Sequence, residues 1–265
     1  MLIDIREIIY KKTGRRLPKW LSRPLERLIH QNELNEIWET GKELSPIEFL
    51  RHTLNYLNVE YSVKHTAPIA KEDRYIFASN HPFGGMDGMM IIDALYRQWG
   101  DSGAIVNDLL MNVKPLAPLF VAVNKYGKQD SEKSRRYDEA LSSPTKQLLT
   151  FPAGFCSRVF DGEIKDIEWK SRFIKDAERY GRKVVPVYVD GTLSKRFYRI
   201  YRLRRFFHIK VNIELVLLVD EMFRQRGKHI TIVFGEPCDV STLEGNAAER
   251  CMLIRKQAYG LKNRL

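Results

Sequence analysis

Residues 75–88 read YIFASNHPFGGMDG, and this stretch indicates how the chain is built. It begins with an apolar run and passes into a glycine-rich segment. The residues after it, Met89 to Trp99, repeat apolar side chains at helical spacing. This order predicts a buried strand, a loop and a helix. Loops at such junctions present side chains and backbone N–H groups to ligands, so we expect a functional site here.

The loop contains a histidine and an aspartate that can act as a pair. A neutral imidazole can take a proton from an attacking hydroxyl, and a carboxylate on its other nitrogen fixes the tautomer and stabilises the imidazolium. His81 and Asp87 lie six residues apart, so the chain must turn at Gly84-Gly85 to bring them together. The structural alternative makes Asp87 the cap of the following helix and His81 an ordinary loop histidine. The unusual composition of the loop favours the catalytic pair.

The composition favours an anionic partner. Lys and Arg number 44 against 33 Asp and Glu, which gives a formal net charge of +11. Such a charge attracts nucleic acid, an anionic membrane surface or an acidic carrier protein, and charge alone does not choose among them. At 265 residues the chain is long enough to bury a large core.

The cysteines and the apolar runs predict a cytoplasmic protein with peripheral membrane contact. Cys156, Cys238 and Cys251 form neither the pairs of a metal knuckle nor the even set of a disulfide scaffold, which favours a reducing compartment. The first residues lack the apolar core of a signal peptide. No apolar run approaches the roughly 20 residues that a membrane-spanning helix needs. We therefore expect the protein at the inner face of the cell membrane.

Residues 1–57 show helical patterns only. Apolar residues recur at helical spacing from Leu2 to Ile9 and from Pro24 to Trp38, and Ser45-Pro46-Ile47-Glu48 has the form of a capping box. These patterns predict an N-terminal helical extension that packs on the main domain. In the alternative, its first helix and the corner Lys19-Trp20-Leu21 lie against lipid.

From residue 58 onward, short apolar runs alternate with helical segments. The runs cover 59–63, 74–78, 104–106, 120–123, 147–151, 183–189 and 229–234, and further helices are expected at 214–225 and 247–261. Strands separated by helices predict an α/β domain over residues 58–265, with a mixed, largely parallel central sheet flanked by helices. Sites in such sheets lie at strand ends.

Polar residues follow three further strands. They are Asn124-Lys125-Tyr126-Gly127-Lys128, FPAGFCSR at residues 151–158, and Asp190-Gly191-Thr192. We hypothesise that these segments converge on the edge that carries His81. The alternative for Lys125 and Arg158 is a solvated surface charge.

Residues 195–210 form the most basic region. Aromatic residues interleave with Lys195, Arg196, Arg199, Arg202, Arg204, Arg205 and Lys210. This pattern favours a bilayer interface, where each basic group near an anionic surface contributes about 1 kcal/mol. Nucleic-acid binding and a plain amphipathic surface helix are the alternatives.

The motifs resemble those of the glycerolipid acyltransferase superfamily, which includes lysophosphatidic acid acyltransferases. NHPFGGMDG resembles its HxxxxD motif, VAVNKYGK stands in the place of the second motif, FPAGFCSR resembles FPEGTRS, and VVPVYV resembles the fourth. The form HPxGGxDG, the triplet PAG and the stretch LNYLNVEY are most similar to bacterial enzymes that O-acylate lyso-amino-acid lipids, such as lyso-glycine and lyso-ornithine lipids.

Two departures from the superfamily pattern matter, one for the geometry of the His81–Asp87 pair and one for the acceptor. One extra residue separates His81 from Asp87, Ala153 replaces a Glu, and Lys125 replaces an Arg. The family associates the last two positions with holding glycerol phosphate. Their change favours a lyso-amino-acid lipid, with lysophosphatidic acid as the alternative acceptor.

The resemblance implies acyl transfer from acyl carrier protein or coenzyme A to a lyso-lipid hydroxyl, with no acyl-enzyme, metal or cofactor. His81 and Asp87 are the expected catalytic pair. The expected substrate-binding residues, including N–H groups that stabilise the oxyanion, are Asn80, Gly84, Gly85, Lys125, Gly154, Ser157, Arg158 and Pro186. A nucleophilic Cys156 and a zinc site are weaker enzymatic alternatives. The alternative from another class is a basic protein that binds membranes or nucleic acid without catalysis.

Overall fold

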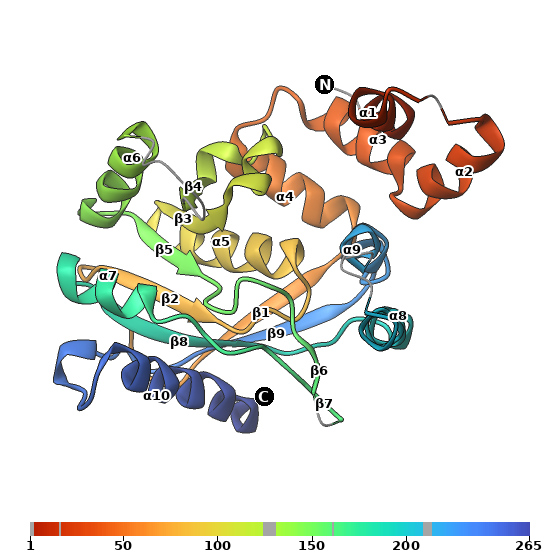
Figure 1. The fold of residues 1–265 in the computed structure, drawn as a ribbon. Coiled ribbons are helices and arrows are strands. Elements are labelled where there is room, and N and C mark those ends of the chain that lie inside the picture. Colours follow the sequence, from red (N-terminus) through yellow and green to blue (C-terminus); the bar gives the residue numbers. More distant parts are fainter. Residues whose placement is uncertain (1–2, 16, 124–130, 161, 209–213) are drawn as a thin grey trace. The chain divides into compact units, whose positions relative to one another are not determined.

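The computed structural model describes residues 3–15, 17–123, 131–160, 162–208 and 214–265 (Figure 1). The chain forms two compact units, one of Met1–Val59 with Leu193–Lys228 and one of Glu60–Thr192 with His229–Leu265. The basic region that begins at Lys195 therefore belongs to the same compact unit as the N-terminal helices. The domain boundary expected at residue 57 stays a prediction.

A mixed sheet forms the centre of the second unit. Among the described residues it has seven strands in the order β1-β9-β8-β2-β5-β3-β4. They are β1 Glu60–His65, β2 Tyr75–Ser79, β3 Ser102–Asn107, β4 Phe120–Val123, β5 Gln147–Thr150, β8 Lys183–Val189 and β9 His229–Phe234. Neighbouring strands pair in parallel except β8 and β9, which are antiparallel. The predicted mixed, largely parallel sheet is confirmed.

Helices cover both faces of this sheet. Figure 1 shows α5 and α10 on opposite faces. The helices of this unit are α5 Gly85–Trp99, α6 Ser131–Ser142, α7 Arg172–Tyr180 and α10 Ala247–Gly260, with 3-10 helices at Asp108–Asn112, Ala117–Leu119, Val240–Thr242 and Leu261–Arg264. Ile76, Leu148 and Val184 point to one face and form a core with apolar residues of α6, α7 and α10. Phe77 points to the other face, where its ring lies 5.5 Å from that of Trp99 in α5.

Some elements of this unit are missing from the sequence-based assignment. The antiparallel pair β6 Arg158–Phe160 and β7 Glu163–Lys165 forms a separate small sheet. The apolar patterns predict neither this pair nor the helices α6 and α7. Strands of three residues are too short to show a period. Half of the residues of helix α6 are charged, and its buried face consists of Tyr137, Ala140 and Leu141.

The first unit is helical in its described part. Its helices are α1 Ile5–Thr13, α2 Lys19–Leu28, α3 Gln31–Gly41, α4 Pro46–Tyr56, α8 Lys195–Phe206 and α9 Glu214–Phe223. The capping box of Ser45 and Glu48 is present at the start of α4. The apolar pattern of residues 24–38 is divided between α2 and α3, because His30 adopts a left-handed conformation with φ 49°. Its ring nitrogens lie 3.0 Å from the Glu33 carboxylate and 3.1 Å from that of Asp220 in α9.

A buried arginine connects several elements of the second unit. Arg182 is 2% exposed and lies just before β8. Its guanidinium donates hydrogen bonds to five main-chain carbonyls, those of Tyr75, Ala140, Leu141, Ser143 and Lys146. Three of these close the end of α6, where a positive charge also complements the helix dipole. Burial lowers the pKa of Arg182 to about 10, so the side chain stays charged at neutral pH.

Replacing this arginine should destabilise the fold. We expect Arg182→Met to lower the free energy of unfolding by about 3–5 kcal/mol, because buried carbonyls lose their donors. Urea denaturation measures the change. The exposed Lys175→Met on α7 is the control and should stay within about 0.5 kcal/mol of the wild type. A loss below about 1 kcal/mol in Arg182→Met would contradict this account.

Candidate active site

The ends of three strands meet at one edge of the sheet. Strand β2 lies between β5 and β8 and is parallel to both, so the residues that follow these strands emerge side by side. They include Asn80 and His81, the segment 151–158, and Asp190-Gly191-Thr192. Strand β4 pairs only with β3 in the described sheet. Lys125, which follows β4, lies outside the described residues.

The turn between His81 and Asp87 brings the two side chains together. Gly84 has φ 78° and ψ −123°, a conformation that favours glycine, and α5 begins at the next residue. Asp87 lies in the first turn of α5, and its carboxylate is 3.1 Å from Nδ1 of His81. The same carboxylate accepts the N–H of Phe83 at 2.9 Å. The structural alternative, Asp87 as the cap of α5, is wrong, because Gly84 occupies the N-cap position and no described side chain caps this helix. Asp87 instead lies within reach of His81.

The His81 ring keeps one nitrogen available for a substrate. Its face stacks on Phe151, with ring centroids 3.9 Å apart, and its side chain is 16% exposed. Within the described ranges no residue forms a hydrogen bond with Nε2. A neutral ring with Nδ1–H directed at Asp87 carries its lone pair on Nε2, where it can accept a proton.

Charges around His81 raise its pKa. Burial alone lowers the pKa, but the charge and hydrogen bond of Asp87 outweigh burial, and the charge of Asp166 adds to them. Arg158 acts in the opposite direction. The imidazolium is therefore stabilised, as a group that receives a proton during a reaction requires.

Asn80 joins the ends of β2 and β8. Its side-chain oxygen accepts the N–H of Val189 at 2.7 Å, and its amide nitrogen donates to the carbonyl of the same residue at 3.0 Å. Beyond β8, a Cβ at Gly191 would lie 2.0 Å from the ring of Phe83, so only glycine fits there. Asn80 thus shapes the edge that carries His81, and its contact with substrate stays a prediction.

The residues after β5 surround His81 from the other side. Ser157 donates its N–H to the carbonyl of His81 at 2.8 Å, and its hydroxyl donates to Asp166 at 2.6 Å. Arg158 is buried and donates to the carbonyls of Cys156 and Ser157. Gly154 turns the loop with φ 69°.

Pro186 is not part of this edge. It lies inside β8 opposite Ala78, and its carbonyl accepts the N–H of Gly235. Proline has no N–H to offer an oxyanion. The N–H groups of Gly84 and Gly85 remain suitable for stabilising an oxyanion, because they form no hydrogen bond with an acceptor in the described part of the chain. Asp166 is not among the residues predicted from the sequence, because no motif surrounds this residue.

Comparison with known proteins identifies the family. A family model described as "Acyltransferase" matches residues 9–265. The chain belongs to this acyltransferase family. It is 37% identical over 247 residues to a lyso-glycine lipid O-acyltransferase of Bacteroides thetaiotaomicron, covering 92% of this chain and 90% of that protein. A protein of the same name from Phocaeicola vulgatus is 34% identical, with 92% and 88% covered.

A solved structure shares the fold. It is the crystal structure of the 1-acyl-sn-glycerophosphate acyltransferase PlsC from Thermotoga maritima, with a TM-score of 0.50 and 17% identity over 82% of this chain and 78% of that one. The suspected membership of the acyltransferase superfamily is thus confirmed, and the protein is an enzyme that transfers acyl groups.

A cysteine nucleophile is disfavoured at the acyltransferase site. Cys156 is 4% exposed, and burial raises the pKa of its thiol to about 11, which opposes a thiolate nucleophile. No group of three potential metal ligands occurs among the described residues.

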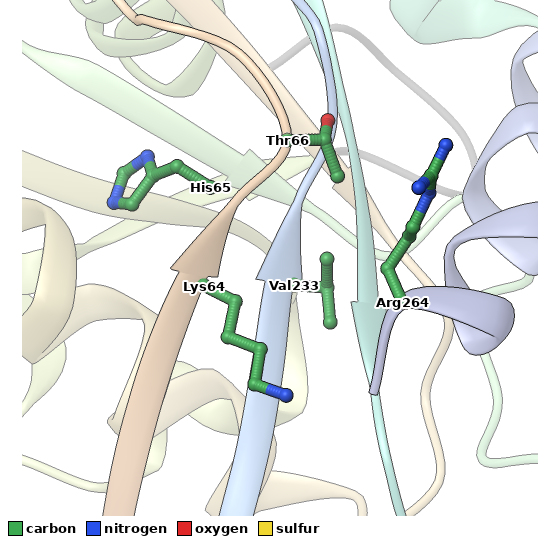
Figure 2. A pocket seen from close by; sticks show the side chains of 5 residues that line it. All are labelled: Lys64, His65, Thr66, Val233 and Arg264. Atoms are coloured by element: carbon green, nitrogen blue, oxygen red, sulfur yellow. The ribbon is translucent and has the colours of Figure 1, made fainter.

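A cavity of about 550 Å³ lies elsewhere on the acyltransferase sheet (Figure 2). Its lining residues are Lys64, His65, Thr66, Val233 and Arg264. It occupies the carboxyl ends of β1 and β9. Because β9 is antiparallel to β8, this is the edge opposite to His81. Figure 2 shows the His65 ring turned away from Thr66 and Arg264.

The charges predict how His81 titrates. We expect its pKa to lie above the ordinary value of about 6.5, and to fall in Asp87→Asn, where burial remains but the main opposing charge is lost. NMR of ¹⁵N-labelled histidine measures both values. Since folding raises this pKa, protonated His81 stabilises the fold at low pH, and that contribution disappears as the pH rises through the folded-state pKa. An unchanged titration in Asp87→Asn would contradict the assignment.

Proposed function

We propose that this acyltransferase esterifies the hydroxyl of a lyso-amino-acid lipid, of the lyso-glycine type, with a fatty acyl group from acyl carrier protein or coenzyme A. The observation that carries the proposal is the 3.1 Å contact between Nδ1 of His81 and Asp87, with no described residue hydrogen-bonded to Nε2 at the strand edge. The names of relatives that match most of the chain at 34% and 37% identity support the acceptor.

The proposed reaction needs one base and no covalent enzyme intermediate. Nε2 of His81 takes the proton of the lipid hydroxyl as its oxygen attacks the thioester carbonyl. The negative oxygen that forms is stabilised by the N–H groups at Gly84 and Gly85, at the positive end of α5. Collapse of the tetrahedral intermediate releases the thiolate of the donor, which takes the proton from the His81 imidazolium. The products are an ester and a free thiol.

The third motif supports an acceptor without glycerol phosphate. Ala153 stands where the family pattern has Glu, and its side chain is completely buried beside Ile76 and Ala78. This position therefore offers no carboxylate to an acceptor. Lysophosphatidic acid remains the second candidate, favoured by the fold shared with PlsC.

Removing the base tests the reaction. We expect His81→Ala to reduce acyl transfer to lyso-glycine lipid by at least about 10²- to 10⁴-fold while keeping the wild-type circular dichroism spectrum. The control His229→Ala changes an exposed histidine of β9 and should keep full activity. Mass spectrometry of the lipid products identifies the acceptor.

Two outcomes would change the proposal. Near-wild-type turnover by His81→Ala would rule out the base. Formation of phosphatidic acid in preference to a diacylated glycine lipid would make lysophosphatidic acid the acceptor.

A further variant tests the cysteine alternative. Activity retained in Cys156→Ser would exclude a cysteine nucleophile.

Helix α8 supports the proposed contact with an anionic membrane surface. No described helix is long and apolar enough to cross a bilayer. Phe197, Tyr198 and Tyr201 are buried in the first unit, whereas Leu203, Phe206 and Phe207 are 50%, 75% and 64% exposed. Exposed basic residues flank these apolar side chains: Lys195, Arg196, Arg199, Arg202 and Arg205, with Arg204 half-buried and Lys210 outside the described residues. Arg196 also pairs with Asp220 at 2.9 Å.

Apolar and basic groups together suit an anionic bilayer better than nucleic acid. We expect Phe206→Ser with Phe207→Ser to weaken binding to phosphatidylglycerol vesicles about tenfold or more, because two exposed rings no longer enter the interface. Vesicle co-sedimentation measures the change. Met252→Ser on α10, also an exposed apolar residue, is the control. Equal binding of the double variant and the wild type would contradict a membrane role for α8.

A further inference from the structure

Asp166 connects the two loops on either side of His81. This residue follows β7 and is 2% exposed. Its Oδ1 accepts the Ser157 hydroxyl at 2.6 Å and the His81 N–H at 3.3 Å, and its Oδ2 accepts the Trp169 indole N–H at 2.9 Å. The loop after β2 and the loop after β5 therefore share one carboxylate oxygen.

The main chain of Asp166 is anchored on α10. Its N–H donates to the hydroxyl of Tyr259 at 2.7 Å, and its carbonyl accepts from Arg255 at 3.1 Å. Helix α10 in turn packs against β8 through the buried residues Ile254 and Ala258. The carboxylate is thus fixed to the core of the second unit rather than carried by a free loop.

The contacts restrict His81 at four points. Asp166 holds its N–H, the Ser157 N–H holds its carbonyl, Asp87 holds Nδ1, and the Phe151 ring covers one face. Two of these contacts depend on the Asp166 carboxylate, directly or through Ser157. The direction in which Nε2 points also depends on these two backbone contacts, because the imidazole ring is attached to the His81 backbone that they hold.

We infer that Asp166 is a positioning residue for acyl transfer: by holding the His81 N–H and the Ser157 hydroxyl together, it aims Nε2 at the acceptor oxygen. The inference rests on the proposed role of His81 as the base. A general base works only within hydrogen-bond reach of the proton it takes, and a displacement of about 1 Å can cost about 10²-fold in rate. Asp166 contacts His81 without facing the reacting atoms.

The charge of Asp166 gives this role a measurable signature. The charged groups that face His81 are Asp87 from α5, Asp166 after β7, and Arg158 of β6. Burial lowers the pKa of His81, and the two carboxylates raise it. Burial raises the pKa of Asp166 itself, while its three donors favour the charged form. Loss of this charge should therefore lower the pKa of His81.

The test compares Asp166→Asn with Glu168→Gln, which neutralises an exposed carboxylate two residues away. The assay follows transfer to lyso-glycine lipid from palmitoyl-CoA or palmitoyl acyl carrier protein, whichever the wild type uses. We expect Asp166→Asn to lower kcat about 10- to 100-fold with little change in the KM of the donor. The acidic limb of its kcat/KM profile should move to lower pH. Glu168→Gln should match the wild type in both respects.

A second variant tests the positioning role of Asp166 if Asp166→Asn does not fold. Trp169→Phe keeps an aromatic ring and the Asp166 charge but removes the donor to Oδ2, so kcat should fall several-fold with the acidic limb unmoved. The inference would be overturned if either variant folds and keeps the wild-type kcat. It would also be overturned if Asp166→Asn folds and the acidic limb of its kcat/KM profile does not move. If His81→Ala is inactive while Asp166→Asn behaves as wild type, this inference fails alone. Near-wild-type acyl transfer by His81→Ala would instead contradict the proposed function.

Discussion

The parallel pairing of β2 with β5 and β8 is the constraint on which the site depends. Parallel neighbours bring their carboxyl ends to one edge, so the loops with His81, Ser157 and Asp190 emerge together although they are far apart in the chain. Asn80 extends this alignment beyond the strands, because its amide bonds both main-chain groups of Val189. The ends of β2 and β8 are therefore joined at this edge by side-chain as well as main-chain hydrogen bonds.

Most polar side chains of the motifs are used within the protein. The Asn80 amide bonds to Val189 and the Ser157 hydroxyl to Asp166, while the Arg158 guanidinium donates to carbonyls of its own loop. The sequence motifs predict substrate contacts for all three residues. Buried polar groups must be satisfied, and here main-chain carbonyls and the Asp166 carboxylate satisfy them. His81 differs, because its Nε2 has no partner in the described part of the chain. The polar residues of the motifs thus join the loops that form the site.

Individual strands and helices show which features of the fold the sequence patterns predict. The apolar runs 120–123, 183–189 and 229–234 are strands with those bounds, because a buried strand needs a continuous apolar stretch. The break at His30 was not expected, since contacts with Asp220, distant in the sequence, stabilise it. The grouping of Leu193–Lys228 with the N-terminal helices was likewise beyond local patterns, because α8 is held by packing among helices.

The sequence by itself determined the types of the principal elements, the largely parallel character of the sheet, and the turn in which His81 can reach Asp87. These follow from local rules, namely apolar periodicity and the conformational freedom of glycine at Gly84. Only the tertiary structure decided the antiparallel pairing of β9, the partner of Asn80, and the position of Asp166 beneath the His81 loop. Each of these joins residues that are distant in the chain, and their approach depends on how strands and helices pack, which no local pattern specifies.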